Sequence, residues 1–367
     1  MLTYLKKELM EINNWVQPSE VKLLGIDTQV QDVELAQANA GVVGQDRMQS
    51  LTNARLGSIH LDGQAEYCQV GAPLFEFIQQ VDRSRTIGNG TYSYLDWLDT
   101  RRLLELGQNA CSTVWGAGAF RQLGRLSFFY SVDKVYDKMK ADLKTLKTAM
   151  DAAGANTQLE IIIACSTAGG TGAGTLIDTA WLLRKAAQTV NLQNYVLRAF
   201  IVLPTAFEPA GPIIDKRLRS YCFWRELDRF MLSSLAVAGN TKIVFNPQAN
   251  PPLEVSCDRA IFDNTYLVDP DRHPNPLNHL SPEQGVFPAV SHMISFILDN
   301  LSGHRFAAHY PNVAIAGGVQ LPPGVYHSAF GCYTIKVPVY QARDRQSREL
   351  AYAAGAVVSK TLVDKTA

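Results

Sequence analysis

The sequence lacks long apolar runs, net charge and any block of one charge sign. No apolar run approaches the roughly 20 residues that a membrane-spanning helix needs. The first residues, MLTYLKKELMEINNW, mix charged and apolar side chains instead of forming a signal-peptide core. Lysine plus arginine and aspartate plus glutamate each number 34, so bulk charge gives no support for nucleic-acid binding. We therefore expect a cytoplasmic protein that neither enters a membrane nor binds nucleic acid.

Paired cysteines are also missing. The six cysteines are scattered and contain no C-x-x-C pair, and the two short histidine pairs lack the helical i, i+4 spacing of zinc ligands. This pattern predicts reduced, mostly buried thiols and no protein metal site. The cysteines are Cys68, Cys111, Cys165, Cys222, Cys257 and Cys332.

Short apolar runs are present, and they alternate with amphipathic segments through about residue 270. Runs at 21–27, 159–165, 196–203 and 264–269 are typical of parallel strands that helices cover on both faces. Residues 134–154 place apolar side chains at three- and four-residue steps, which predicts an amphipathic helix. The sequence therefore predicts a doubly wound, mostly parallel α/β sheet, with ligands beyond the carboxyl ends of its strands.

A different pattern follows that part of the chain. Residues 286–303 are mostly apolar and predict a long buried helix, and residues 332–340 predict a strand after it. These features divide the chain into three predicted parts: a nucleotide-binding domain at 1–280, a central helix with its following loop at 281–311, and the start of an α+β domain, complete or incomplete, at 312–367.

The segment 164–175, ACSTAGGTGAGT, lies between a predicted strand and a predicted amphipathic helix. Glycines permit close approach of a ligand to the backbone, and the first turn of a helix offers free N–H groups and a positive dipole end, so the segment predicts a phosphate site. No lysine follows the glycines, which excludes the P-loop pattern, and the spacings G-x-G-x-x-G and G-x-S-x-G are absent as well. The alternative is that the glycines only permit tight packing of strand and helix.

The run AGGTGAGT closely resembles the signature G-G-G-T-G-[ST]-G of tubulin and of the bacterial division protein FtsZ. Ala168 replaces the first glycine and Ala173 occupies the small-residue position. In that family this loop wraps the nucleotide phosphates. The resemblance covers roughly residues 20–340 and is greatest to bacterial tubulin-like proteins outside the FtsZ branch.

Three other landmarks occur in the family's order. LLGIDTQVQ is similar to the second strand and the loop after it, WGAGAFRQLGR to the loop at the terminal phosphate, and VLPTAFEPAG to the loop at the ribose. Each has a simpler alternative, since Asp27 can cap the turn after its strand and Glu208 can be a solvated carboxylate. The resemblance implies that the nucleotide contacts Asp27, Thr28, Gly116, Ala117, Gly118, Ser166, Thr167, Gly169, Gly170, Thr171, Gly172, Gly174, Glu208, Arg217, Phe287 and Ser291.

The chain departs from the family at three places. The family's first strand and first phosphate loop have no counterpart here, so the chain is a fragment, starts downstream of the true start, or has lost that half of the site. Phe287 suits base stacking or simply the core, but Ser291 stands where an aspartate reads guanine, unless Asn264 or His292 compensates. The hydrolytic acid pair is missing, and only Asp299 and His304 remain as weak candidates for a general base.

The resemblance implies a fold of the tubulin/FtsZ type that binds GTP or GDP with Mg²⁺ and polymerises head to tail with copies of itself. GTP hydrolysis would be slow or dependent on a neighbouring subunit. The main alternative is a tubulin-fold scaffold that does not hydrolyse nucleotide. A third interpretation is an unrelated α/β enzyme that binds a phosphorylated metabolite.

Overall fold

The computed structural model describes most of the first 298 residues and a short strand near 328. The chain divides into two compact units, Met1–Phe330 and Gly331–Ala367, and all of the described residues belong to the first. The predicted strand at 332–340 lies outside them. The described residues are 1–12, 18–29, 61–62, 64–87, 94–118, 120–154, 157–210, 213–231, 242–269, 282, 285–298 and 327–329.

The main sheet is parallel and has the order β3-β4-β7-β8. β3 and β4 pair over their whole length, from Leu159 opposite Tyr195 to Ser166 opposite Val202. Their apolar sequences predicted these strands, and the structure confirms them. The strands are β3 (Leu159–Ser166), β4 (Tyr195–Val202), β7 (Asn264–Val268) and β8 (His327–Ala329).

Two smaller sheets accompany the main one. β1 (Gly25–Asp27) and β2 (Tyr67–Gln69) form a parallel pair, and β5 (Lys242–Asn246) and β6 (Leu253–Ser256) form an antiparallel pair. Apart from this antiparallel pair, every strand pairing among the described residues is parallel, as the apolar runs predicted. β8 belongs to the main sheet, although the sequence-based division places residue 312 onward in a later domain.

Helices and strands alternate from β3 to α11, whereas several helices follow one another between β2 and β3. The predicted amphipathic helix at 134–154 is confirmed as α9, whose last residue Ala153 is followed by the C-cap residue Gly154. Met139 and Leu143 on its apolar face are buried. The helices are α1 (Leu2–Ile12), α5 (Phe75–Ile87), α6 (Tyr94–Trp97), α7 (Thr100–Glu105), α8 (Arg121–Tyr130), α9 (Val132–Ala153), α10 (Gly170–Thr189), α11 (Ile213–Met231) and α12 (Val286–Leu298), with a 3-10 helix, η2, at Pro204–Ala210.

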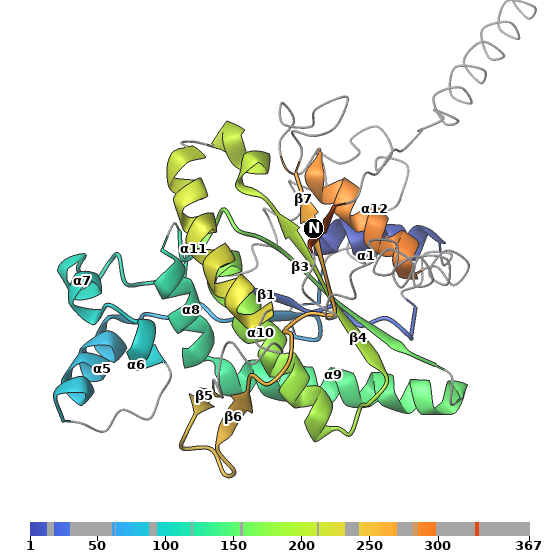
Figure 1. Ribbon diagram of the computed structural model, residues 1–367, viewed down its shortest axis with the longest axis horizontal. Helices are drawn as coiled ribbons and strands as arrows, with labels where there is room; N and C mark the ends of the chain where they lie inside the picture. Colours follow the sequence, from blue (N-terminus) through green and yellow to red (C-terminus); the bar gives the residue numbers. More distant parts are fainter. Residues whose placement is uncertain are drawn as a thin grey trace, which may run out of the picture. The chain divides into compact units, whose positions relative to one another are not determined.

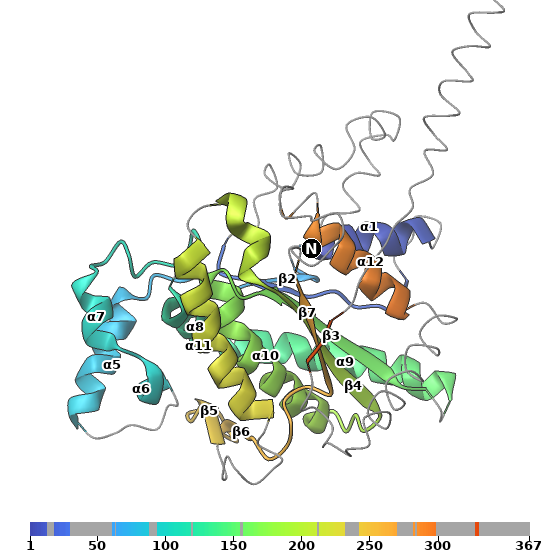
Figure 2. The ribbon, with the colours of Figure 1, turned by 45° about the horizontal axis from the view of Figure 1, so that its top comes forward.

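Helices cover both faces of the main sheet because successive residues of a strand point to opposite sides. On β4, Leu197, Ala199 and Ile201 join one apolar cluster, to which α8, α9, α10 and α11 contribute. Phe200 and Val202 join a second cluster with α1 and α12. The views in Figures 1 and 2 agree that α1 and α12 lie side by side.

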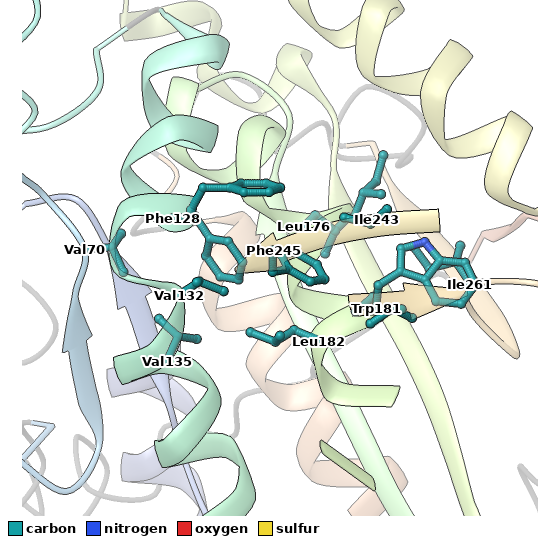
Figure 3. Packing of buried hydrophobic residues seen from close by; sticks show 14 of the residues in the cluster. Val70, Phe128, Val132, Val135, Leu176, Trp181, Leu182, Ile243, Phe245 and Ile261 are labelled. Carbon is teal, nitrogen blue, oxygen red and sulfur yellow. The ribbon is translucent and has the colours of Figure 1, made fainter. Parts of the chain in front are cut away.

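The first cluster is the larger core. Phe128 of α8, Trp181 of α10 and Phe245 of β5 are among its most deeply buried side chains, and Figure 3 shows them facing a shared interior. The rings of Phe129 and Phe245 approach to 5.2 Å between centroids. This core fixes the position of α10 relative to α8, and therefore the place where both helices begin.

Two expectations of complete burial hold only in part. β4 is almost entirely buried, whereas all eight residues of β3 are partly exposed, because β3 is an edge strand among the described residues. α12 buries Val290, Ile294 and Ile297 on one face, but Phe296 on the other face is 48% exposed. The apolar sequences predict a strand and a helix at these positions, but they do not show which elements cover each face.

Candidate functional site

The glycine segment forms the junction between β3 and α10, as the sequence predicted. Gly169 is the N-cap residue with an extended backbone, and α10 begins at Gly170. A Cβ atom at Gly172 would overlap the carbonyl oxygen of Ser166, so this glycine is required for packing of helix against strand. Gly169 is exposed, and a Cβ atom there would meet open space. The glycines therefore serve both packing and access.

The first turn of α10 retains unsatisfied donors. The N–H groups of Thr171 and Gly172 have no hydrogen-bond partner in the described part of the chain. The N–H of Gly170 is used, because it donates to the carbonyl oxygen of Gly118 at 2.9 Å. Two free N–H groups at the positive end of a helix dipole can hold an anion.

A second glycine loop, residues 116–118, lies against the first. Gly116 and Gly118 have φ angles of +113° and +54°, in the region that favours glycine. The loop leads into α8, which crosses α10 at backbone contact. A Cβ atom at Gly124 would lie 2.7 Å from the carbonyl carbon of Gly170, and one at Gly174 would lie 2.6 Å from the Arg121 carbonyl oxygen. The two loops are therefore parts of one structure.

Thr28 joins the loop after β1 to both glycine loops. Its buried hydroxyl accepts a hydrogen bond from the Ala117 N–H at 3.0 Å and lies 2.8 Å from the Thr171 hydroxyl. Asp27 caps this turn, because one of its carboxylate oxygens accepts from the Thr28 N–H at 2.6 Å. Three segments far apart in the sequence thus meet at one hydroxyl, although Thr28 itself is fully buried.

Buried charges fasten the helices behind these loops. Arg125 donates to both carboxylate oxygens of Asp178, at 2.6 and 2.9 Å, and to Glu226 at 2.7 Å. Burial alone would lower the pKa of Arg125, but the carboxylates of Asp178 and Glu226 outweigh it and raise this pKa. Arg121 also pairs with Glu226 and donates to the Ala173 carbonyl oxygen. This network links α8, α10 and α11. It includes Arg125, which ends the motif WGAGAFRQLGR that the resemblance placed near the terminal phosphate, and the side chain of Arg125 is paired with carboxylates instead.

The residues predicted at the ribose and base lie on η2 and α12. The rings of Phe207 and Phe287 are 6.2 Å apart between centroids, so the two elements meet there. The Ser291 hydroxyl is buried and lies within hydrogen-bonding distance of the Met1 and Phe287 carbonyl oxygens, at 3.0 and 2.8 Å. Asp299, His304 and the side chain of Glu208 lie outside the described residues.

The chain matches one known protein family. Residues 2–354 match the sequence profile of a family described as tubulin like. The chain belongs to the tubulin-like family. The match spans nearly the whole chain and confirms the resemblance carried by the glycine segment. No curated protein matches the sequence, and no solved structure matches it.

The remaining predicted residues of this tubulin-like protein differ in what they contact. The Thr167 hydroxyl lies 2.8 Å from that of Ser220 on α11, and the Ser166 hydroxyl accepts from the Ala168 N–H at 3.1 Å. These two side chains support the loop. Arg217 of α11 is exposed. Twelve of the predicted residues thus lie on the three segments that meet at Thr28, at positions within 27–28, 116–118, 166–172 and 174. Phe287 and Ser291 form a second group, on α12.

Sequence reasoning missed Arg219 of α11. Its guanidinium donates to the carbonyl oxygen of Ala168, next to Gly169, at 3.3 Å. Helical periodicity gives no clear signal for it, because Arg217 and Arg219 lie at similar angles on opposite sides of the face formed by the buried Ser220, Phe223 and Leu227. In the structure Arg219 is half-buried, whereas Arg217 is exposed.

Two kinds of feature are absent from the described residues of this tubulin-like protein. These residues contain no group of three or more histidine, cysteine, aspartate or glutamate side chains arranged to hold a metal ion. No helix in the described part of the chain is long and apolar enough to cross a membrane.

Proposed function

We propose that this tubulin-like protein binds GTP or GDP with Mg²⁺ at its two glycine loops. One observation carries the proposal. The free N–H groups of Thr171 and Gly172 lie in the first turn of α10, next to the hydrogen bond that joins this helix to the loop 116–118. In this assignment the segment 166–174 holds the phosphates and the loop 116–118 lies at the terminal one. Asp27, which caps the turn at Thr28, is the carboxylate we assign to Mg²⁺, an ion that prefers oxygen ligands and keeps most of its contacts with phosphate and water.

Polymerisation and hydrolysis extend the proposal. Family membership supports head-to-tail assembly of copies of this chain, since a heterologous interface that does not close produces a filament. Hydrolysis would be slow or would require a neighbouring subunit, because the loop after the central helix lacks the family's acid pair. Asp299 and His304 remain the candidate bases.

A non-hydrolysing scaffold is the second candidate. The observation that favours it is the Ser291 hydroxyl, which stands at the proposed base-reading position but already pairs with the Met1 and Phe287 carbonyl oxygens. A base would have to displace these contacts or bind without them. In this alternative the glycine contacts between α8 and α10 serve packing alone.

Calorimetric titration with GTP in the presence of Mg²⁺ tests the proposal, with ATP as the control ligand. The most informative variant is Gly169→Val. Its side chain would enter open space, and the extended backbone of Gly169 suits valine, so the fold should persist while ligand approach is blocked. We expect saturable binding of GTP to the unmodified chain and loss of binding in the variant, with unchanged circular dichroism.

The same titration separates the alternatives. Absence of binding to both nucleotides would favour the scaffold. Equal binding in Gly169→Val would move the ligand away from the glycine segment. For assembly, pelleting and electron microscopy with GTP and Mg²⁺ should reveal filaments, and phosphate release should rise more steeply than protein concentration; a strictly monomeric protein would contradict this part of the proposal.

A further inference from the structure

The glycine segment has no lysine, so any protein cation that joins the proposed Mg²⁺ at a bound polyphosphate has to come from another element. Two arginines close to α10 are already neutralised. Arg121 pairs with Glu226, and Arg125 pairs with both Asp178 and Glu226. These side chains hold helices together and have little positive charge left for a ligand.

Arg219 differs from both. It forms no ion pair within the described residues, and its one hydrogen bond there is the 3.3 Å contact from the guanidinium to the Ala168 carbonyl oxygen. Its Nε atom is buried and has no partner in that part of the chain. Leaving a buried donor unpaired is costly, so this atom calls for a partner such as an ion or a water molecule.

The turn of α11 that carries Arg219 is firmly seated against the glycine segment. Ser220 lies 2.8 Å from the Thr167 hydroxyl and accepts from the Trp224 indole N–H at 3.1 Å. Phe223, one turn later, is completely buried. Ordering the guanidinium at Ala168 therefore requires no movement of the helix.

We propose that Arg219 is the cation of the anion site, donating to phosphate oxygens of the ligand held at Gly169–Gly172. The inference rests on the proposed nucleotide function and names the residue that replaces the lysine of other phosphate loops. A guanidinium offers several N–H groups in a fixed plane that matches phosphate, so it forms charge-assisted hydrogen bonds from a position beside the loop. Because the contact is made to phosphate, it acts on inorganic tripolyphosphate as well as on GTP.

The experiment measures calorimetric affinities for GTP and for tripolyphosphate in the unmodified chain, Arg219→Gln and Arg219→Lys. Arg219→Gln should lose about 10- to 100-fold affinity for both ligands, with the larger loss at low salt, because a contact between charges is screened by ions. Arg219→Lys should retain part of the affinity. Arg225→Gln is the matched control, since Arg225 lies on the exposed side of the same helix and contacts Tyr221.

Arg217→Gln decides between the two arginines. The proposal expects the larger loss in Arg219→Gln, and the reverse order would overturn it in favour of the residue implied by family resemblance. Unchanged affinity in Arg219→Gln, with normal binding by the unmodified chain, would overturn the role of Arg219 while leaving nucleotide binding intact. Failure of the unmodified chain to bind either ligand would reject the proposed function and this inference with it. If Arg219→Gln does not fold, the comparison of Arg219→Lys with the unmodified chain applies the same test.

Discussion

Two helix pairs border the candidate site, and they are held together by different physics. α8 and α10 touch through the backbone at Gly124, Gly170 and Gly174, and buried arginine–carboxylate pairs flank the contact. α1 and α12 meet mainly through aliphatic side chains, including those of Leu5 and Ile294, with one contact of 3.6 Å between His292 and Glu8 beside them. The first interface specifies one geometry because every donor must meet its acceptor, whereas aliphatic packing tolerates small adjustments. The two glycine loops lie on the interface with the stricter geometry.

Removing one buried charge should have the largest effect on this comparison. Asp178→Ala leaves the buried guanidinium of Arg125 without its bidentate partner, and such a change costs about 3–5 kcal/mol of unfolding free energy. Urea denaturation followed by circular dichroism measures it. The control is Asp151→Ala on α9, which breaks an exposed pair with Lys147 and should cost less than about 0.5 kcal/mol. Equal effects in the two variants would contradict the buried-network interpretation.

A single added methyl group should have the next largest effect. Gly124→Ala places a Cβ atom against the Gly170 carbonyl group and should destabilise the fold by about 1–3 kcal/mol. Gly169→Ala adds the same methyl group where nothing lies within 4 Å, so its stability should match or slightly exceed that of the unmodified chain. Thermal unfolding of both variants distinguishes them. A stable Gly124→Ala variant would mean that α8 and α10 can separate without loss.

The sequence revealed the elements of this interface more readily than the interface itself. Apolar runs located β3 and β4, and the glycine cluster located the start of α10, because burial and backbone freedom leave local patterns. The partner of Arg125 is 53 residues away, and nothing in the spacing of charges selects Asp178 over other carboxylates. The exposure of β3 likewise depends on which strands flank it. Such pairings are set by tertiary packing, which a single sequence does not record locally.

The choice between Arg217 and Arg219 illustrates the same limit more finely. A resemblance transfers a residue type to a region, but it does not decide which of two neighbouring arginines lies at the glycine segment. The structure distinguishes the two arginines by their surroundings, because Arg219 is half-buried and donates to the Ala168 carbonyl oxygen, whereas Arg217 is exposed. Tertiary contacts and family resemblance should therefore be combined residue by residue.

The smallest expected effect concerns the pH dependence of the two interfaces. Burial raises the pKa of the Glu226 carboxyl, but Arg125 and Arg121 outweigh burial and hold this pKa below its ordinary value of 4.5. A carboxyl with a lowered folded-state pKa stabilises the fold above its unfolded-state pKa, and that contribution disappears as pH falls through the folded-state value. The cost of Glu226→Gln should thus be about 1–3 kcal/mol at pH 7 and shrink below about pH 4.5. Ile294→Val, at the interface of α1 and α12, should cost about 0.5–1.5 kcal/mol at every pH, because it removes only a methylene group. Urea denaturation of both variants between pH 7 and pH 4 measures the difference, and a pH-independent cost for Glu226→Gln would show that its carboxylate contributes packing rather than charge.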